Sequence, residues 1–143
     1  MVEGFRQIDA EVGWRCGVAG WWIVRVEYDL HPEFTRKLTV TLQNGRDGEC
    51  ATVSVSGVTS FRVQNEREMH DFGLRRQAEG VASGMFFKVS KSGYLSDFDG
   101  GVSATAKPQT HYILFAEDDC LEFIGPAWAR DFRIEIAQPA QVR

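Results

Sequence analysis

The stretch Thr110–Gly125, which reads T-H-Y-I-L-F-A-E-D-D-C-L-E-F-I-G, decides the fold that we expect for this chain. Two apolar runs flank a short acidic turn, and aspartate tolerates the unusual backbone angles of tight turns better than most residues do. With Asp118 and Asp119 as the two loop residues, Leu114 would face Phe123. The stretch therefore predicts a β-hairpin with an acidic tip.

The two faces of this hairpin can be read separately, because side chains alternate across a strand. One face is wholly apolar and carries Tyr112, Leu114, Ala116, Leu121 and Phe123. The other is apolar at its base and polar near the turn, and carries His111, Ile113, Phe115, Glu117, Cys120, Glu122 and Ile124. A hairpin that is apolar on both faces is expected inside a sheet, covered on both sides at its base.

Working outward, the same alternation predicts six more strands, at Trp21–Tyr28, Lys37–Gln43, Cys50–Ser56, Thr59–Gln64, Val81–Ser90 and Asp131–Ile136. In the first of them, Trp22, Val24, Val26 and Tyr28 share one face. The second and third strands have aliphatic residues inward and Thr or Ser outward, with Asn-Gly and Asp-Gly turns between them. Thr59–Gln64 is expected to return as the third strand of a meander, with Phe61 and Val63 inward.

The remaining segments interrupt this pattern. Residues 1–20 fit either a short opening helix or an irregular arm, because Phe5, Ile8 and Val12 recur at helical spacing before several glycines. Asn65–Gly80 predicts a charged surface excursion, and Lys91–Gln109 predicts a long loop. We expect residues 1–143 to form one mainly β domain of antiparallel sheet, as a β-sandwich or strongly curved sheet with at most one or two short helices.

Composition narrows the classes of partner and compartment. The 143 residues carry 16 basic and 20 acidic side chains, a formal charge of −4. This balance argues against nucleic-acid binding, which needs a basic surface, and is compatible with a basic protein partner. Three cysteines far apart favour reduced thiols, and neither a signal peptide nor a membrane-spanning apolar run is visible. We therefore expect a cytoplasmic protein without a membrane partner.

No motif predicts catalysis, a metal or a cofactor. The start of a calcium loop at Asp97–Gly100 fails, because Val102 stands where a glycine is needed and Pro108 where a glutamate is needed. The three histidines have no spacing that makes a zinc face. Cys120 follows two aspartates, whose charge disfavours a reactive thiolate. We therefore predict no catalytic residues and no cofactor.

The acidic tip is the feature that predicts binding. Glu117, Asp118 and Asp119 are adjacent at the end of the hairpin, with Glu122 expected to reinforce them. Asp97 and Asp99 would add to this patch if the fold places their loop nearby. Concentrated carboxylates speed and orient the approach of a basic partner. The plainer alternative is a solvated turn whose charge keeps the protein in solution.

A family resemblance points the same way. S-V-S-G-V-T-S-F-R-V at 54–63, H-Y-I-L-F at 111–115, an acidic turn, C-L-E-F-I at 120–124 and a closing amphipathic strand follow one another. In this order the C-terminal two thirds of the chain resembles small bacterial immunity proteins of polymorphic-toxin and contact-dependent growth inhibition systems. The resemblance implies a cytoplasmic inhibitor that binds a cognate toxin domain, often a nuclease, through acidic side chains. Only the acidic turn is carried over residue by residue.

Two other classes stay open. The first is a small-molecule binder or an enzyme, with a cavity in a curved sheet lined by Trp21, Trp22, Phe86 and Phe115. A deep, partly polar pocket would favour this class, and a filled core would count against it. The second is a housekeeping domain that works only as a homodimer.

Overall fold

The structure is a computed structural model that describes residues 4–16, 20–30, 36–65, 84–90, 92–94, 109–126 and 132–137. Its elements follow the chain in the order β1 (Gly4–Gln7), α1 (Asp9–Val12), β2 (Trp21–Asp29), β3 (Lys37–Asn44), β4 (Cys50–Val55), β5 (Ser60–Asn65), β6 (Phe86–Ser90), β7 (Gln109–Phe115), β8 (Asp119–Pro126) and β9 (Phe132–Ala137). Among the described residues, α1 is the one helix with assigned bounds.

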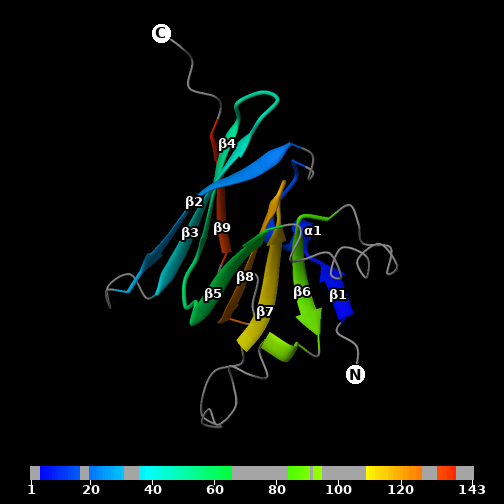
Figure 1. Cartoon of the computed structure of the whole chain (residues 1–143), viewed down its shortest axis with the longest axis vertical. Coiled ribbons are helices and arrows are strands. Elements are labelled where there is room, and N and C mark those ends of the chain that lie inside the picture. The colour runs from blue at the N-terminus through cyan, green and yellow to red at the C-terminus, as the bar shows by residue number, and fades with distance from the viewer. Residues whose placement is uncertain are drawn as a thin grey trace.

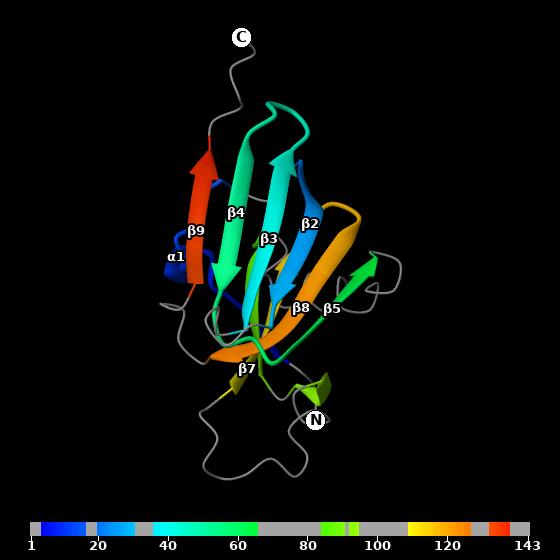
Figure 2. The same cartoon turned by 90° about the vertical axis from the view of Figure 1, so that its left-hand side faces the viewer.

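The strands form two antiparallel sheets that face each other (Figure 1). The first sheet has the order β1-β6-β7-β8-β5, and the second has the order β2-β3-β4-β9. Figure 2 shows the strands of the second sheet side by side, with β9 and β2 at its edges. This arrangement confirms the predicted mainly β, sandwich-like fold. The predicted central hairpin, β7–β8, occupies the interior of the first sheet.

One apolar core fills the space between the sheets. The second sheet contributes Leu38, Val40, Leu42, Ala51, Val53 and Val55, and the first contributes Phe86, Tyr112, Leu114, Leu121 and Phe123. This confirms the inward residues predicted for 37–43 and 50–56 and the apolar face predicted for the hairpin. Fully burying a large apolar side chain stabilises the fold by about 1.5–3 kcal/mol relative to leaving it exposed.

The opposite face of the first sheet is also buried. Its apolar cluster consists of Phe5, Phe87, Val89, Ile113 and Cys120, with Phe115 packed against it. Strands that are covered on both faces read as nearly continuous apolar runs. This explains why the base of the hairpin is apolar on both sides, as the sequence predicted.

The face assigned to Trp21–Tyr28 was wrong at its start. Trp21 is fully buried, whereas Trp22 is 41% exposed and Val24 is 54% exposed. The register of β2 on β3 shifts between Ile23 and Arg25, so a β-bulge adds one residue to β2. An extra residue exchanges the two faces beyond it. Ile23 therefore packs against the core before the bulge, and Val26 and Tyr28 do so after it.

The predicted meander was also wrong, because β5 belongs to the other sheet. Gly57 has φ +81°, a conformation that glycine adopts without strain. The backbone N–H of Thr59 then donates to the carbonyl of Ile124 at 2.9 Å, at the start of pairing with β8. As the free edge of the first sheet, β5 packs Phe61 against the core but leaves Val63 47% exposed.

The N-terminal segment combines an edge strand with a one-turn helix, in place of the helix or irregular arm that the sequence left open. Phe5, Ile8 and Val12 are all buried. The Asp9 carboxylate fastens α1 to β6 by accepting hydrogen bonds from the backbone N–H groups of Met85 and Phe86 at 2.7–3.1 Å. Burial raises the pKa of this carboxyl above its usual value, although the hydrogen bonds it accepts oppose the rise.

Parts of other predictions lie outside the described residues. They include most of the expected surface excursion, residues 66–80, and most of the expected loop, residues 95–108. In the part of the chain that the structure describes, no helix is long and apolar enough to cross a bilayer. None of the three cysteines, Cys16, Cys50 and Cys120, takes part in a disulfide.

Candidate functional site

The acidic tip is a four-residue turn and not the two-residue loop that we expected. Phe115 and Cys120 form the last pair of β7 and β8, so Ala116–Asp119 make the turn. The N–H of Ala116 donates to the carbonyl of Asp119 at 3.0 Å, and Asp118 adopts φ +61°. The register differs from the predicted one by two residues, which preserves both faces because side chains alternate with period two.

Hydrogen bonds fasten the tip to the second sheet. The backbone N–H of Glu117 donates to the carbonyl of Trp21 at 2.8 Å. In return, the backbone N–H of Gly20 donates to Oε1 of Glu117 at 3.1 Å. The carbonyl of Gly20 also accepts from the N–H of Gly45 at 2.8 Å, in the turn between β3 and β4. The tip is therefore held by hydrogen bonds to Gly20 and Trp21, and Gly20 is itself bonded to the β3–β4 turn.

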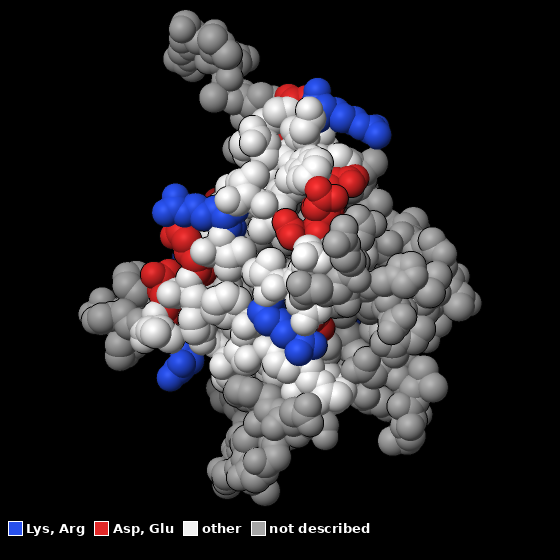
Figure 3. All heavy atoms as spheres, in the orientation of Figure 1, with Lys and Arg blue, Asp and Glu red and all other residues white. Residues whose placement is uncertain are grey.

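This end of the sandwich is rich in carboxylates. Glu117 and Asp118 are exposed and Asp119 is half-buried, and Figure 3 shows acidic side chains grouped on this face. The neighbouring β3–β4 turn adds Asp47 and Glu49. Burial raises the pKa of the nearby Cys16 thiol, and both of these carboxylates raise it further. We call Glu117, Asp118 and Asp119 the acidic tip from here on.

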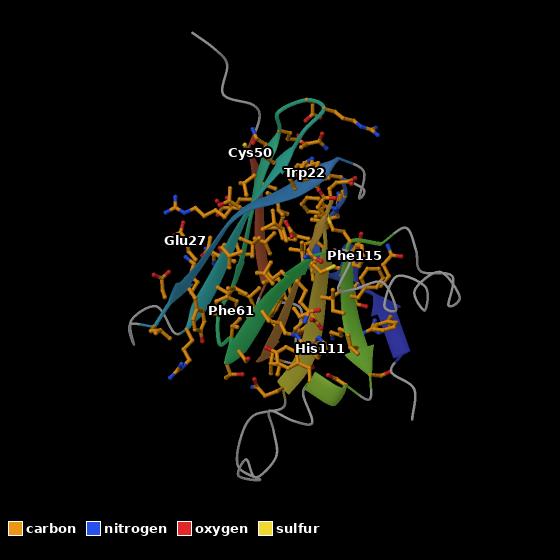
Figure 4. The ribbon with its side chains drawn as sticks, viewed as in Figure 1. Trp22, Glu27, Cys50, Phe61, His111 and Phe115 are labelled. Carbon is orange, nitrogen blue, oxygen red and sulfur yellow. The ribbon has the colours of Figure 1, made fainter. Side chains whose placement is uncertain are left out.

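An exposed tryptophan adjoins the acidic tip. Trp22 follows Trp21, the residue whose carbonyl receives the hydrogen bond from Glu117. The Trp22 indole nitrogen would lie 3.2 Å from a Cβ added at Gly45, so its ring packs beside the β3–β4 turn. Figure 4 shows Trp22 at this upper end of the molecule. Tryptophan is enriched at protein interfaces and among the residues that contribute most of the binding energy, so Trp22 indicates a candidate contact surface at this end.

Glu122 does not reinforce the acidic tip, which corrects our expectation. It lies on β8 opposite Ile113 and is only 2% exposed. Arg62 donates to it from Nε at 2.7 Å and from Nη2 at 3.2 Å, and His111 Nε2 donates at 2.8 Å. Burial alone would raise the pKa of the Glu122 carboxyl, but these hydrogen bonds outweigh it and hold the pKa below its usual value.

His111 extends this buried polar network to a short segment before β7. Its Nδ1 lies 2.6 Å from the hydroxyl of Ser92, which is 7% exposed. The Tyr94 and His111 rings meet edge to face, with their centroids 5.1 Å apart. The guanidinium carbon of Arg62 lies over the Tyr94 ring, 4.1 Å from its centroid. In Figure 4, His111 lies at the opposite end of β7 from Phe115, so the network is remote from the tip.

The order serine, histidine, carboxylate resembles an acyl-transfer triad, but the details differ. In such triads Nε2 faces the serine and Nδ1 faces the carboxylate, whereas here Nδ1 faces Ser92 and Nε2 faces Glu122. Ser92 is buried, and Arg62 already pairs with the carboxylate. The network therefore fits a structural role, holding residues 92–94 against the sheet.

One feature of the sequence indicates part of this network. His111 and Glu122 share a face of the predicted hairpin, and buried polar side chains on a sheet usually find one another. Arg62 could not be predicted as part of this network, because its strand, β5, pairs with β8 only when the chain crosses to the first sheet.

The four aromatic residues proposed to line a cavity do not meet in one. Trp21 and Phe86 are buried in the core between the sheets, where Trp14 contacts both rings at 5.0 and 5.6 Å. Trp22 is exposed, and Phe115 packs against the cluster on the opposite face of the first sheet. Within the described part of the chain, these four side chains therefore do not line a common site.

A separate open cavity of about 430 Å³ lies along β1 and β6. Arg6, Lys88, Ser90 and Thr110 contribute to its lining. Arg6 pairs with the carboxylate of Glu11, so its charge is already balanced. The cavity therefore offers a weaker basis for function than the acidic tip does.

Two residues proposed for partner binding, Asp97 and Asp99, lie outside the described residues. Within the described ranges, no group of three or more His, Cys, Asp or Glu side chains could hold a metal ion. No family model, no curated protein and no solved structure matches this chain.

Proposed function

We propose that this chain is a cytoplasmic immunity protein that binds and neutralises a cognate toxin domain with a basic surface. One observation carries the proposal: three adjacent acidic residues, two of them exposed, lie at a turn that hydrogen bonds to Gly20 and Trp21 fix near an exposed tryptophan. A turn that serves only solubility needs charge but no anchoring. The resemblance in strand order to small bacterial immunity proteins supplies the class of partner.

The acidic tip and Trp22 would contribute differently to binding. Exposed carboxylates attract a basic partner over a range of about 8–10 Å at ordinary salt, which speeds the encounter. A tryptophan that becomes desolvated in the complex slows dissociation, because interface energy concentrates in buried aromatic side chains. Anchoring Glu117 to Gly20 and Trp21 reduces the entropy that the tip would lose on binding.

The proposal predicts an effect of Trp22→Ala on the complex. Where the gene immediately upstream encodes a large secreted protein, the C-terminal domain of that protein is the partner to use. It is captured with the tagged chain, and the interaction is measured by surface plasmon resonance. We expect Trp22→Ala to raise the dissociation rate by about thirtyfold, the effect of losing an interface hot spot. Val63→Ala, which also shortens an exposed apolar side chain, is the matched control.

Two results would contradict the proposal. If wild-type chain neither captures that domain nor protects cells that express it, the immunity function is refuted. If capture occurs but Trp22→Ala dissociates no faster than Val63→Ala, the partner binds elsewhere on the molecule.

A further inference from the structure

The outer edge of β2 is a long strand edge without a neighbouring strand in the described sheets. β2 has nine residues and stands at the end of the second sheet. Beyond its ladder with β3, its described backbone makes one hydrogen bond, from the N–H of Glu117 to the carbonyl of Trp21 at 2.8 Å. Exposed strand edges are templates for pairing with another strand.

The register identifies which backbone groups point outward. The N–H of Asn44 donates to the carbonyl of Glu49 at 2.8 Å, towards β4. The backbone N–H and C=O groups of Asn44, and of every second residue before it on β3, therefore point towards β4 and away from β2. Residues that face each other in an antiparallel pair either exchange both hydrogen bonds or neither. Val26 faces Val40, which shares the direction of Asn44. The N–H and C=O groups of Val26 therefore point to the free edge.

Exposed apolar side chains gather on this side of the sandwich. The large hydrophobic residues exposed among the described residues are Trp22, Val24, Leu30 and Val63. The first three lie on β2 or directly after it. Val63 lies on β5, and the rings of Tyr28 and Phe61 join these two edge strands at a centroid distance of 5.1 Å. Apolar surface concentrated at one place marks an interaction site.

The charges on β2 are self-complementary about Val26. Arg25 and Glu27 flank it on the outer face, form an ion pair at 2.7 Å, and have side chains 69% and 47% exposed. When a second copy pairs antiparallel with Val26 opposite the partner's Val26, Arg25 faces the partner's Glu27. Opposite charges facing each other across antiparallel strands stabilise the pairing.

We propose that the edge of β2 is a homodimer interface, in which two copies of this chain pair antiparallel about Val26 and join their second sheets. The occupant is a second copy because a two-fold interface requires a self-complementary surface, and the sequence Arg25-Val26-Glu27 provides one. The β-bulge at Ile23/Arg25 limits regular pairing towards the Trp22 end, which restricts the edge to this register.

Charge exchange tests the interface with the full-length chain. Sedimentation equilibrium of the wild type should show a dimer. R25E places like charges opposite each other, and so does E27R, so each should weaken the dimer by about thirtyfold. Mixing the two variants in equal amounts should restore a heterodimer, and the double exchange R25E/E27R should restore the homodimer. Both side chains are exposed, so urea unfolding of each variant should match the wild type at protein concentrations too low for dimerisation.

Three results would overturn the proposal. The wild type could be monomeric at every concentration up to about 1 mM, the range of weak association. The single variants could dimerise as tightly as the wild type, which would place the interface elsewhere. The single variants could lose binding to a toxin domain while the wild type stays monomeric, which would make the edge a site for another protein. The charge-exchange variants alter neither the acidic tip nor Trp22, so loss of the dimer and loss of toxin binding can be told apart.

Discussion

The ion pair between Arg62 and the buried Glu122 can be tested by replacing Arg62 with methionine. The substitution keeps an apolar stem over Tyr94 and removes two hydrogen bonds of 2.7 and 3.2 Å. A hydrogen bond to a charged group contributes about 1.5–3 kcal/mol. Because the Arg62 side chain is 44% exposed, solvent screens part of this, and we expect a total loss of about 2 kcal/mol. For a domain of this size that loss lowers Tm by about 7 °C.

The pH dependence of this loss follows from the direction of the Glu122 shift. In the wild type the folded pKa lies below the unfolded value. The ionised carboxylate therefore contributes stability above the unfolded pKa, and this stability disappears as the pH falls through the folded pKa. Without Arg62 the hydrogen bond from His111 remains, but one of the interactions that oppose the effect of burial is lost, so the pKa of Glu122 is higher in the variant than in the wild type. The variant is therefore least stable, relative to the wild type, at pH values where the Glu122 carboxyl must ionise. The difference between wild type and variant should be largest at pH 7 and should shrink towards pH 4.

Urea unfolding followed by tryptophan fluorescence at pH 7, 5.5 and 4 measures this difference. Arg6→Met is the matched control, because Arg6 pairs with Glu11 while both side chains are exposed. Such surface pairs contribute about 0–1 kcal/mol. If Arg62→Met loses no more stability than Arg6→Met at pH 7, or if its deficit is constant with pH, then Arg62 does not stabilise the Glu122 carboxylate.

Three further substitutions test the contacts of Asp9 and the backbone conformation of the acidic tip. Asp9→Asn removes an acceptor of the Met85 and Phe86 N–H groups and should cost about 1–2 kcal/mol in urea unfolding. Because burial raises the pKa of Asp9, the wild type should gain stability relative to this variant as the pH falls from 7 to 4; a constant difference would contradict the shift. Asp118→Gly should stabilise the turn by up to about 1 kcal/mol, since glycine adopts φ +61° without strain. Asp118→Val should destabilise it by a similar amount or more, and equal Tm values for the two variants would refute a strained turn.

Residue alternation predicted most of the fold because it is a local property. The faces of the β7–β8 hairpin were correct even though its turn has four residues and not two. A slip by two residues keeps every side chain on its face, whereas a slip by one would have exchanged them. The alternation of Leu38, Val40 and Leu42 was confirmed for the same reason.

The errors arose where the outcome depends on distant contacts. The bulge in β2 inserts one residue, and nothing in the sequence W-W-I-V-R-V indicates which residue is left without a partner on β3. Gly57 permits a turn, but only the available edge of β8 decides that β5 joins the other sheet. Glu122 was assigned to the tip for its charge and its nearness in sequence. It is instead buried and paired with Arg62, which that same crossing brings opposite it.

The central claim, that the acidic tip binds a basic toxin domain, is tested most directly by neutralising the tip without changing its shape. Glu117→Gln keeps the acceptor for Gly20, and Asn at 118 tolerates the left-handed conformation. These two changes are combined with Asp119→Asn, and Glu135→Gln on the remote strand β9 is the control.

The measurement is the stopped-flow association rate with the toxin domain at 20 mM and 500 mM salt, a span that takes the Debye length from about 20 Å to about 4 Å. We predict association slower by about ten- to a hundredfold for the triple variant at low salt, with the difference vanishing at high salt. An association rate equal to that of the control at low salt would contradict the claim.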